Sequence, residues 1–219
     1  IQNGVNIHEM NPHDHRCCQH NDGHGWPYYA QNLWYATPDN GLAAILYSAS
    51  QVTAKVADGK EVTIKEDTHY PFEEKVAFTV STPEQVSFPL YLRVPGWCDN
   101  PQVSINGKQV KVDAGPRSYL KIDRMFRDGD KISLILPMEV RIKKWEKNKN
   151  SVSVYYGPLA FSLRIEERYE QSGGTEKWPA WEIFPDSPWN YGLELNEAQT
   201  AASFEEVKKE WPESDMPFT

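Results

Sequence analysis

Hydrophobic and polar residues alternate with a period of two over much of the chain from residue 42 onward. Such alternation is typical of strands that bury one face against a core. The longest run places Val86, Phe88, Leu90, Leu92 and Val94 on the same side. The same pattern predicts strands over 52–56, 62–64, 76–80, 86–94, 103–105, 110–112, 120–122 and 132–136.

Turn sequences separate these segments at short intervals. Asp58-Gly59 indicates a turn, and Asn106-Gly107 is the strongest short-range signal for a hairpin, because these residue types accept a positive φ angle. Asp128-Gly129-Asp130 marks a further turn before the last predicted strand of this block. The sequence therefore predicts an all-β fold, an antiparallel β-sandwich of the jelly-roll type.

A helical pattern occurs close to the start of the chain. Trp26, Tyr29 and Leu33 recur at helical spacing, and Pro27 suits a first helical turn. We predict a short helix over 26–35, preceded by a polar and irregular segment over 1–25.

A second β block is predicted in the last third of the chain. The charged run 143–150 indicates a turn or a domain boundary, and alternation resumes over 152–165. Residues 170–192 are rich in Trp, Pro and Gly and are predicted to form a loop. Ser203 and Glu206 fit a capping box, which predicts a helix over 204–211. The strands expected here are too few to close a complete second sandwich.

Composition narrows the classes of function. The chain has 219 residues, of which 39% are hydrophobic and 25% charged, and a net charge of −8. An acidic chain does not offer the basic face that nucleic-acid binding needs, so no nucleic-acid partner is expected. No run of apolar residues reaches the ~20 that a membrane-spanning helix requires, so no membrane partner is expected either. The chain opens at Ile1 without an initiator Met or a signal peptide, and we expect it to be a fragment of a larger protein.

The segment around Cys17 and Cys18 carries the most unusual chemistry. His15 and His20 flank the two cysteines, and thiolates and imidazoles are the ligands that zinc prefers. The alternative is a pair of inert thiols in a polar loop, because adjacent cysteines do not follow a standard zinc-finger spacing. Cys98 has no obvious partner for a disulfide.

Carboxylates and tryptophans offer weaker candidates. Paired carboxylates serve many glycosidases, but the pairs 73–74, 166–167 and 205–206 are adjacent in sequence and are expected to be solvated. Trp97, Trp178, Trp181 and Trp189 have the flat apolar faces that stack on sugar rings, although packing within the protein is the alternative for each.

Several motifs in register resemble the β-L-arabinofuranosidase family of glycoside hydrolases, family 127. Those near the start resemble the end of its catalytic barrel, and the later ones resemble its β-sandwich segments. They are Cys17-Cys18-Gln19-His20-Asn21, Trp26-Pro27-Tyr28-Tyr29-Ala30, Asp39-Asn40-Gly41-Leu42, Leu92-Arg93-Val94-Pro95-Gly96-Trp97, Val103-Ser104-Ile105-Asn106-Gly107, Leu136-Pro137-Met138, Tyr156-Gly157-Pro158-Leu159 and Pro188-Trp189-Asn190-Tyr191.

The resemblance implies an (α/α)6 barrel followed by two β-sandwiches. Residues 1–41 would be the remnant of the barrel, 42–147 the first sandwich and 148–219 a partial second sandwich with a short helix. By the same resemblance, Cys17 is the catalytic nucleophile of a retaining hydrolase, and Cys17 and Cys18 are zinc ligands. The family's Glu-x-Cys ligands and its acid/base Glu have no counterpart before Cys17.

The resemblance implies a retaining glycoside hydrolase that acts on arabinofuranoside-type plant glycans, with carbohydrate as its partner. We expect this chain alone to be inactive and zinc to bind only in the full-length parent. The alternative is a carbohydrate-binding or structural accessory β-sandwich module.

Overall fold

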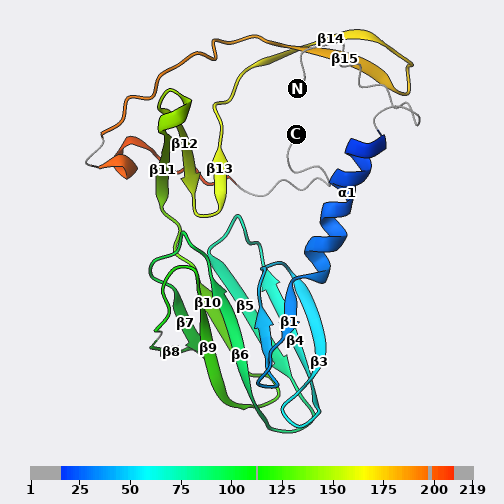
Figure 1. Ribbon diagram of the computed structural model, residues 1–219, viewed down its shortest axis with the longest axis vertical. Coiled ribbons are helices and arrows are strands. Elements are labelled where there is room, and N and C mark those ends of the chain that lie inside the picture. Colours follow the sequence, from blue (N-terminus) through cyan, green and yellow to red (C-terminus); the bar gives the residue numbers. More distant parts are fainter. Residues whose placement is uncertain (1–15, 112, 197–198, 210–219) are drawn as a thin grey trace.

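Two β-sheets packed face to face form the lower part of the molecule (Figure 1). The computed structural model describes residues 16–111, 113–196 and 199–209, with the backbone alone for residues 16–20, 22 and 200. The smaller sheet has the order β1 (Trp34–Ala36), β2 (Leu42–Ala44), β6 (Val86–Val94) and β9 (Ser118–Phe126). The larger sheet has the order β3 (Ser50–Val56), β4 (Lys60–Thr68), β5 (Lys75–Ser81), β10 (Lys131–Ile135), β7 (Gln102–Ile105) and β8 (Lys108–Val110).

The core lies between the inward faces of these two sheets. Alternate residues of β6 are buried as the sequence predicts, and Phe88 packs against Phe126 with ring centroids 4.7 Å apart. From the opposite sheet, Ile64 and Phe78 enter the same cluster. Burying each such side chain stabilises the fold by about 1.5–3 kcal/mol. The predicted all-β sandwich is thus confirmed, with one parallel pair, β2 with β6, among antiparallel strands.

The predicted hairpin turns are also confirmed. Asn106 and Gly107 both have positive φ angles, 50° and 77°, and they join β7 to β8. Gly59 (φ 88°) occupies the turn between β3 and β4. Gly41 is needed for a different reason: a Cβ atom there would lie 2.1 Å from the carbonyl oxygen of Pro89.

The helix near the start of the chain differs from the prediction. Helix α1 spans Arg16–Gln31, so it begins ten residues earlier than expected and replaces the irregular segment predicted over 16–25. It ends before residue 34, because Trp34 and Ala36 pair with Ala44 and Leu42 as strand β1. Pairing with the sheet therefore outweighs the helical spacing of the side chains. The prediction for residues 1–15 lies outside the described residues.

A three-stranded sheet follows the sandwich. It contains β11 (Val140–Trp145), β12 (Ser151–Tyr156) and β13 (Leu159–Phe161). The 3-10 turn η1 (Glu146–Asn148) joins β11 to β12, so the charged run 143–150 is the end of a strand and a turn. The expected domain boundary between residues 147 and 148 falls in this turn, and the division of the chain into domains remains a prediction.

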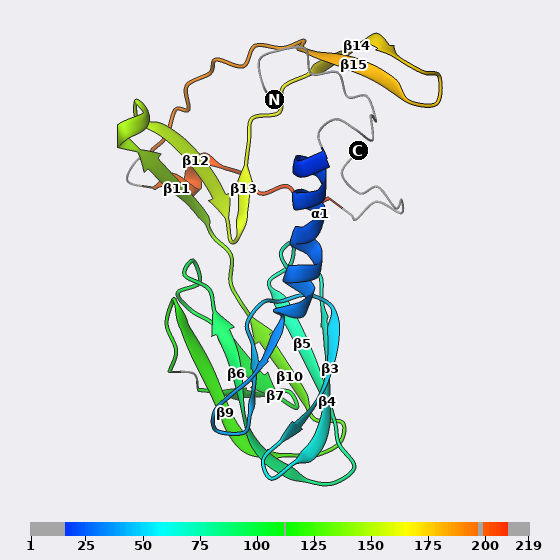
Figure 2. The same ribbon diagram turned by 45° about the vertical axis from the view of Figure 1, so that its right-hand side comes forward.

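The last described part of the chain corrects two predictions. The expected loop over 170–192 contains most of a hairpin formed by β14 (Glu167–Gly174) and β15 (Pro179–Pro185), which lies beyond the three-stranded sheet in both views (Figures 1 and 2). The helix expected over 204–211 is absent from its described part, 204–209, and a 3-10 turn η2 (Thr200–Ser203) precedes it. The Ser203 hydroxyl accepts the Asn196 amide at 3.1 Å instead of capping a helix, and Phe204 is extended.

Helix α1 projects from one end of the sandwich in both views (Figures 1 and 2). No helix in the described residues is both long and apolar enough to span a membrane.

Candidate functional site

Cys17 and Cys18 lie in the first turn of α1, at the end of the helix that is remote from the sandwich. The first turn contains no acidic residue. Amide groups at a helix N-terminus carry partial positive charge and favour a thiolate there. Since only the backbone of these two residues is described, the roles of Cys17 as nucleophile and of Cys17 and Cys18 as zinc ligands remain predictions.

The described side chains do not form a complete zinc site. A structural zinc site has four ligands, and a catalytic one has about three from the protein. No group of three His, Cys, Asp or Glu side chains converges among those that the structure describes. Cys17 and Cys18 would supply two of these ligands, and the zinc site stays a prediction.

The other end of α1 is attached to the loop between β2 and β3. The Tyr29 hydroxyl donates a hydrogen bond to the Tyr47 carbonyl oxygen at 2.7 Å. Just after the helix, the Leu33 carbonyl accepts the Ile45 amide at 2.9 Å. Trp34 donates from its indole nitrogen to the Ser50 hydroxyl at 3.2 Å. This loop therefore sets where the helix leaves the sandwich.

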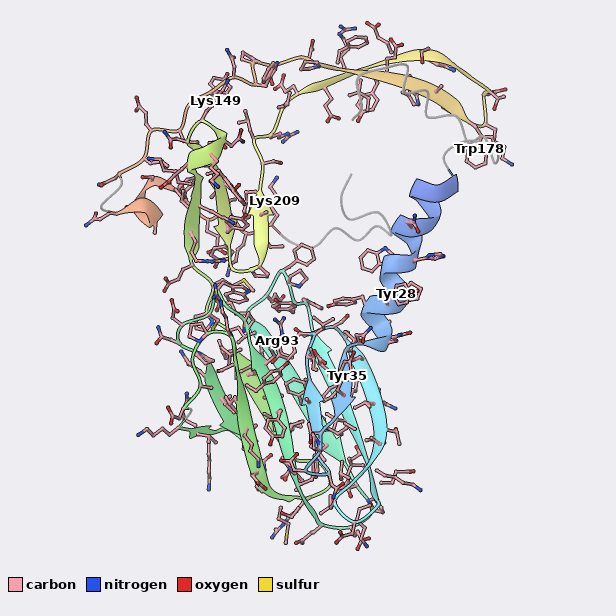
Figure 3. The ribbon with its side chains drawn as sticks, viewed as in Figure 1. Tyr28, Tyr35, Arg93, Lys149, Trp178 and Lys209 are labelled. Carbon is pink, nitrogen blue, oxygen red and sulfur yellow. The ribbon has the colours of Figure 1, made fainter. Side chains whose placement is uncertain are left out.

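A buried polar network holds that loop in place. Tyr47 is 1% exposed and donates its hydroxyl to the Arg93 carbonyl at 2.6 Å. The Arg93 side chain in turn donates from Nε to the Ile45 carbonyl. Figure 3 shows Arg93 at the end of the sandwich that faces α1. The Tyr47 hydroxyl and the Ile45 carbonyl thus both have hydrogen-bond partners within the sandwich.

Glu66 completes this network from strand β4. It is 1% exposed, and its carboxylate oxygens accept the Ser48 amide at 3.0 Å and the Ser50 hydroxyl at 3.3 Å. Burial raises the pKa of Glu66 to about 8, and the two hydrogen bonds only partly oppose this effect. Burial also raises the pKa of Tyr29 and that of Tyr47, and the nearby Glu66 adds to both shifts.

The network links α1 to the sandwich, and the sequence of that sandwich is similar to a known domain family. Residues 41–138 match the model of the β-L-arabinofuranosidase GH127 middle domain. This part of the chain is similar to a GH127 middle domain. The match begins just before β2 and ends just after β10, so it contains both the loop that holds α1 and the whole sandwich core.

The similarity to solved structures covers more of the chain than residues 41–138. The chain resembles Ara127N-Se, a GH127 β-L-arabinofuranosidase from Geobacillus stearothermophilus T6, with a TM-score of 0.59 and 26% identity over 81% of this chain and 32% of that one. The fold is shared with a protein described as a glycoside hydrolase (TM-score 0.61, 22% identity, 84% of this chain and 35% of that one). It is also shared with the GH127 β-arabinofuranosidase BT3674 (TM-score 0.51, 22% identity, 74% and 30%). The chain thus spans about a third of the length of these structures. No curated protein sequence matches it.

The tryptophans proposed as sugar-stacking residues fall into two groups. Trp97, in the sandwich, is half-buried and packs against the core. Trp178, Trp181 and Trp189 lie beyond the sandwich and are 50%, 38% and 64% exposed. Trp178 lies in the turn of the β14–β15 hairpin (Figure 3), and Trp181 meets Tyr169 edge-on. The side chains of Trp178, Trp181 and Trp189 are thus partly exposed, with Lys177 Nζ over the Trp178 ring at 5.5 Å, whereas Trp97 is engaged in packing.

Of the paired carboxylates, Glu74 departs from the expected solvated state. It is half-buried, and its Oε1 accepts the Met138 amide at 2.7 Å. It also lines a hollow of about 330 Å³, together with Phe72, Tyr156 and Lys208 among others. None of the lining residues belongs to α1 or to the loop that holds it.

Sequence reasoning missed Glu66, although a signal was present. Val62 and Ile64 lie on the inward face of β4, and the period of two continues through Glu66 to Thr68. A carboxylate at an inward position of a strand is a candidate for a buried functional or structural group.

Proposed function

We propose that this chain is the C-terminal β-sandwich region of a retaining glycoside hydrolase that acts on arabinofuranoside-type plant glycans. The observation that supports the proposal most directly is the placement of Cys17 and Cys18 in the first turn of a helix whose last turn is anchored in a GH127 middle domain. The family relation supports a glycoside hydrolase; the sugar and the retention of configuration are our inference.

In the proposed reaction, the Cys17 thiolate attacks the anomeric carbon of the sugar. The bond between that carbon and the leaving-group oxygen breaks, and a general acid elsewhere in the whole protein protonates the oxygen. Water then attacks the same carbon and gives its proton to the conjugate base of that general acid, the carbon–sulfur bond breaks and the thiolate is restored. Two successive displacements retain the configuration, and each is easier than a single direct one.

Zinc enters the proposal only for the whole protein. Cys17 and Cys18 would be two of its ligands, and the others would come from outside the described residues. The middle domain would have a structural role, since it holds the helix that presents the two cysteines.

The test is activity and covalent labelling with the longer protein that contains this chain. We expect turnover of p-nitrophenyl arabinofuranosides, loss of at least 1,000-fold in Cys17→Ser, and a sugar adduct on Cys17 by mass spectrometry of trapped intermediate. Cys98→Ser is the matched control, because it makes the same chemical change at a buried thiol outside the helix. Full activity of Cys17→Ser would overturn the proposal.

The 219-residue chain provides a second arm of the test. We expect it to show no turnover, with or without added zinc, while circular dichroism shows folded β-structure. Turnover by this chain alone would contradict its assignment as a supporting region.

A carbohydrate-binding role is the second candidate, favoured by the exposed indole rings of Trp178, Trp181 and Trp189. Titration calorimetry with arabinan oligosaccharides should then show binding that weakens at least fivefold in Trp181→Ala, since stacking on an aromatic ring would be lost. Trp97→Ala is the less informative variant because that side chain packs against the core. Absence of binding by the wild-type chain would exclude this role.

A further inference from the structure

Helix α1 has a sequence that forms a helix poorly without support. It contains Gly23 and Gly25, which favour the unfolded state, and Pro27, which removes a hydrogen bond inside the helix. The first turn has no acidic residue and the last turn no basic one, so charges do not stabilise the helix dipole. The helix must therefore depend on contacts with the rest of the protein.

Tyr29 provides such a contact near the end of the helix. Its side chain is half-buried, and its hydroxyl donates to the Tyr47 carbonyl at 2.7 Å. Tyr28, the adjacent residue, is 62% exposed and projects from the helix (Figure 3). Of these two neighbouring tyrosines, Tyr29 is therefore the one whose hydroxyl forms a hydrogen bond to the sandwich.

The acceptor of this hydrogen bond is firmly held. Tyr47 is 1% exposed, and its ring meets those of Tyr70 and Phe78 edge-on at 5.7 and 6.3 Å. Its hydroxyl is bound to the Arg93 carbonyl, and the next residue, Ser48, donates its amide to buried Glu66. A hydrogen bond to this carbonyl thus connects α1 to the rigid core of the sandwich and not to a free loop.

The geometry of the helix makes this connection important for its far end. Cys17 precedes Tyr29 by twelve residues, which is about 18 Å along a helix axis at 1.5 Å per residue. A tilt of about 10° at the attached end would move the first turn by about 3 Å. Displacements of ~1 Å at reacting groups are known to reduce rates by about 100-fold.

We propose that Tyr29 is a positioning residue, whose hydrogen bond to the Tyr47 carbonyl fixes α1, and with it the Cys17–Cys18 pair, on the end of the sandwich. The consequence for catalysis rests on the proposed function, whereas the attachment of the helix does not. The two parts are therefore tested separately, with Tyr28→Phe as the matched control for Tyr29→Phe.

The attachment is tested by hydrogen exchange in the 219-residue chain, followed by mass spectrometry of peptides from α1. Loss of one hydrogen bond should increase exchange in α1 of Tyr29→Phe about fivefold, while peptides of β4 and β6 remain unchanged. Tyr28→Phe should exchange like the wild type. Equal exchange in the two variants would overturn the proposal.

The catalytic consequence is tested by kinetics in the longer protein with a p-nitrophenyl arabinofuranoside. Tyr29→Phe should lower kcat at least fivefold and leave KM within twofold, because it moves the nucleophile and not the sugar-binding groups. A purely structural role would instead reduce the amount of active enzyme, which active-site titration would reveal, and it would refute positioning. If α1 exchanges faster but Cys17→Ser retains activity, the attachment stands and the proposed function is wrong.

Discussion

Replacement of Glu66 by glutamine should make the chain more stable at pH 8 and remove most of the dependence of its stability on pH between 5 and 8. Glu66 is 1% exposed, and burial raises its pKa from 4.5 to about 8. Its folded environment thus favours the neutral acid. In Glu66→Gln the amide oxygen would still accept the Ser48 amide, and the NH₂ group would donate to the Ser50 hydroxyl in place of the second carboxylate oxygen.

The sign and size of the effect follow from proton linkage. A group whose pKa is higher in the folded state contributes stability in full below its unfolded pKa, and this contribution is lost as the pH rises towards the folded value. For Glu66 the loss occurs between about pH 4.5 and pH 8. The difference between these two pKa values corresponds to about 5 kcal/mol, close to 1.4 kcal/mol per pH unit.

Urea denaturation followed by tryptophan fluorescence at pH 5, 6, 7 and 8 measures this effect. The free energy of unfolding of the wild type should fall relative to that of Glu66→Gln by about 1.4 kcal/mol for each pH unit. Glu61→Gln is the matched control, because Glu61 lies on the same strand but is exposed, and its curve should follow the wild type. Parallel pH curves for the wild type and Glu66→Gln would refute the reasoning.

Two further predictions concern packing in the sandwich. Cys98 is fully buried, and burial raises the pKa of its thiol to about 11. In a variant whose other two cysteines are replaced by serine, the folded chain should not react with Ellman's reagent at pH 8. The same variant should react when it is unfolded in urea. Gly41→Ala should lower the free energy of unfolding by several kcal/mol, about 2–4, because the new Cβ would lie 2.1 Å from the Pro89 carbonyl oxygen. In the control Gly115→Ala, the new Cβ would meet no atom within 4 Å, so the free energy of unfolding should stay within about 0.5 kcal/mol of the wild type. Equal losses in the two alanine variants would contradict the packing argument.

The sandwich could be predicted from the sequence because local and global preferences agree there. In β6 the alternation from Val86 to Val94 matches the faces of the strand, and Asn106-Gly107 adopts the positive φ angles that its turn requires. Prediction fails where the local preference of the residues disagrees with the global fold. Gly23, Gly25 and Pro27 argue against a helix, yet α1 runs through them, and its end is attached to the sandwich.

The candidate site was predictable only in part. The motif around Cys17 and Cys18 indicates the family, but nothing in its residue pattern indicates that the helix begins there. The loop from Ile45 to Ser50 lacks a motif, and its role depends on partners distant in sequence, such as Glu66 and Arg93. Contacts of this kind arise from the packing of strands, which a periodic pattern does not specify.

The hairpin β14–β15 differs from the sandwich in how far its apolar side chains are covered. Tyr169, Trp181 and Ile183 lie on one face of the hairpin, since Tyr169 pairs with Ile183 and contacts Trp181 edge-on. All three are more than a third exposed. A two-stranded hairpin with an uncovered apolar face is marginally stable in water. The sandwich instead closes its core between two sheets within 41–138, the segment that the family model matches. The segment that matches the family model is therefore also the one that buries its own apolar face.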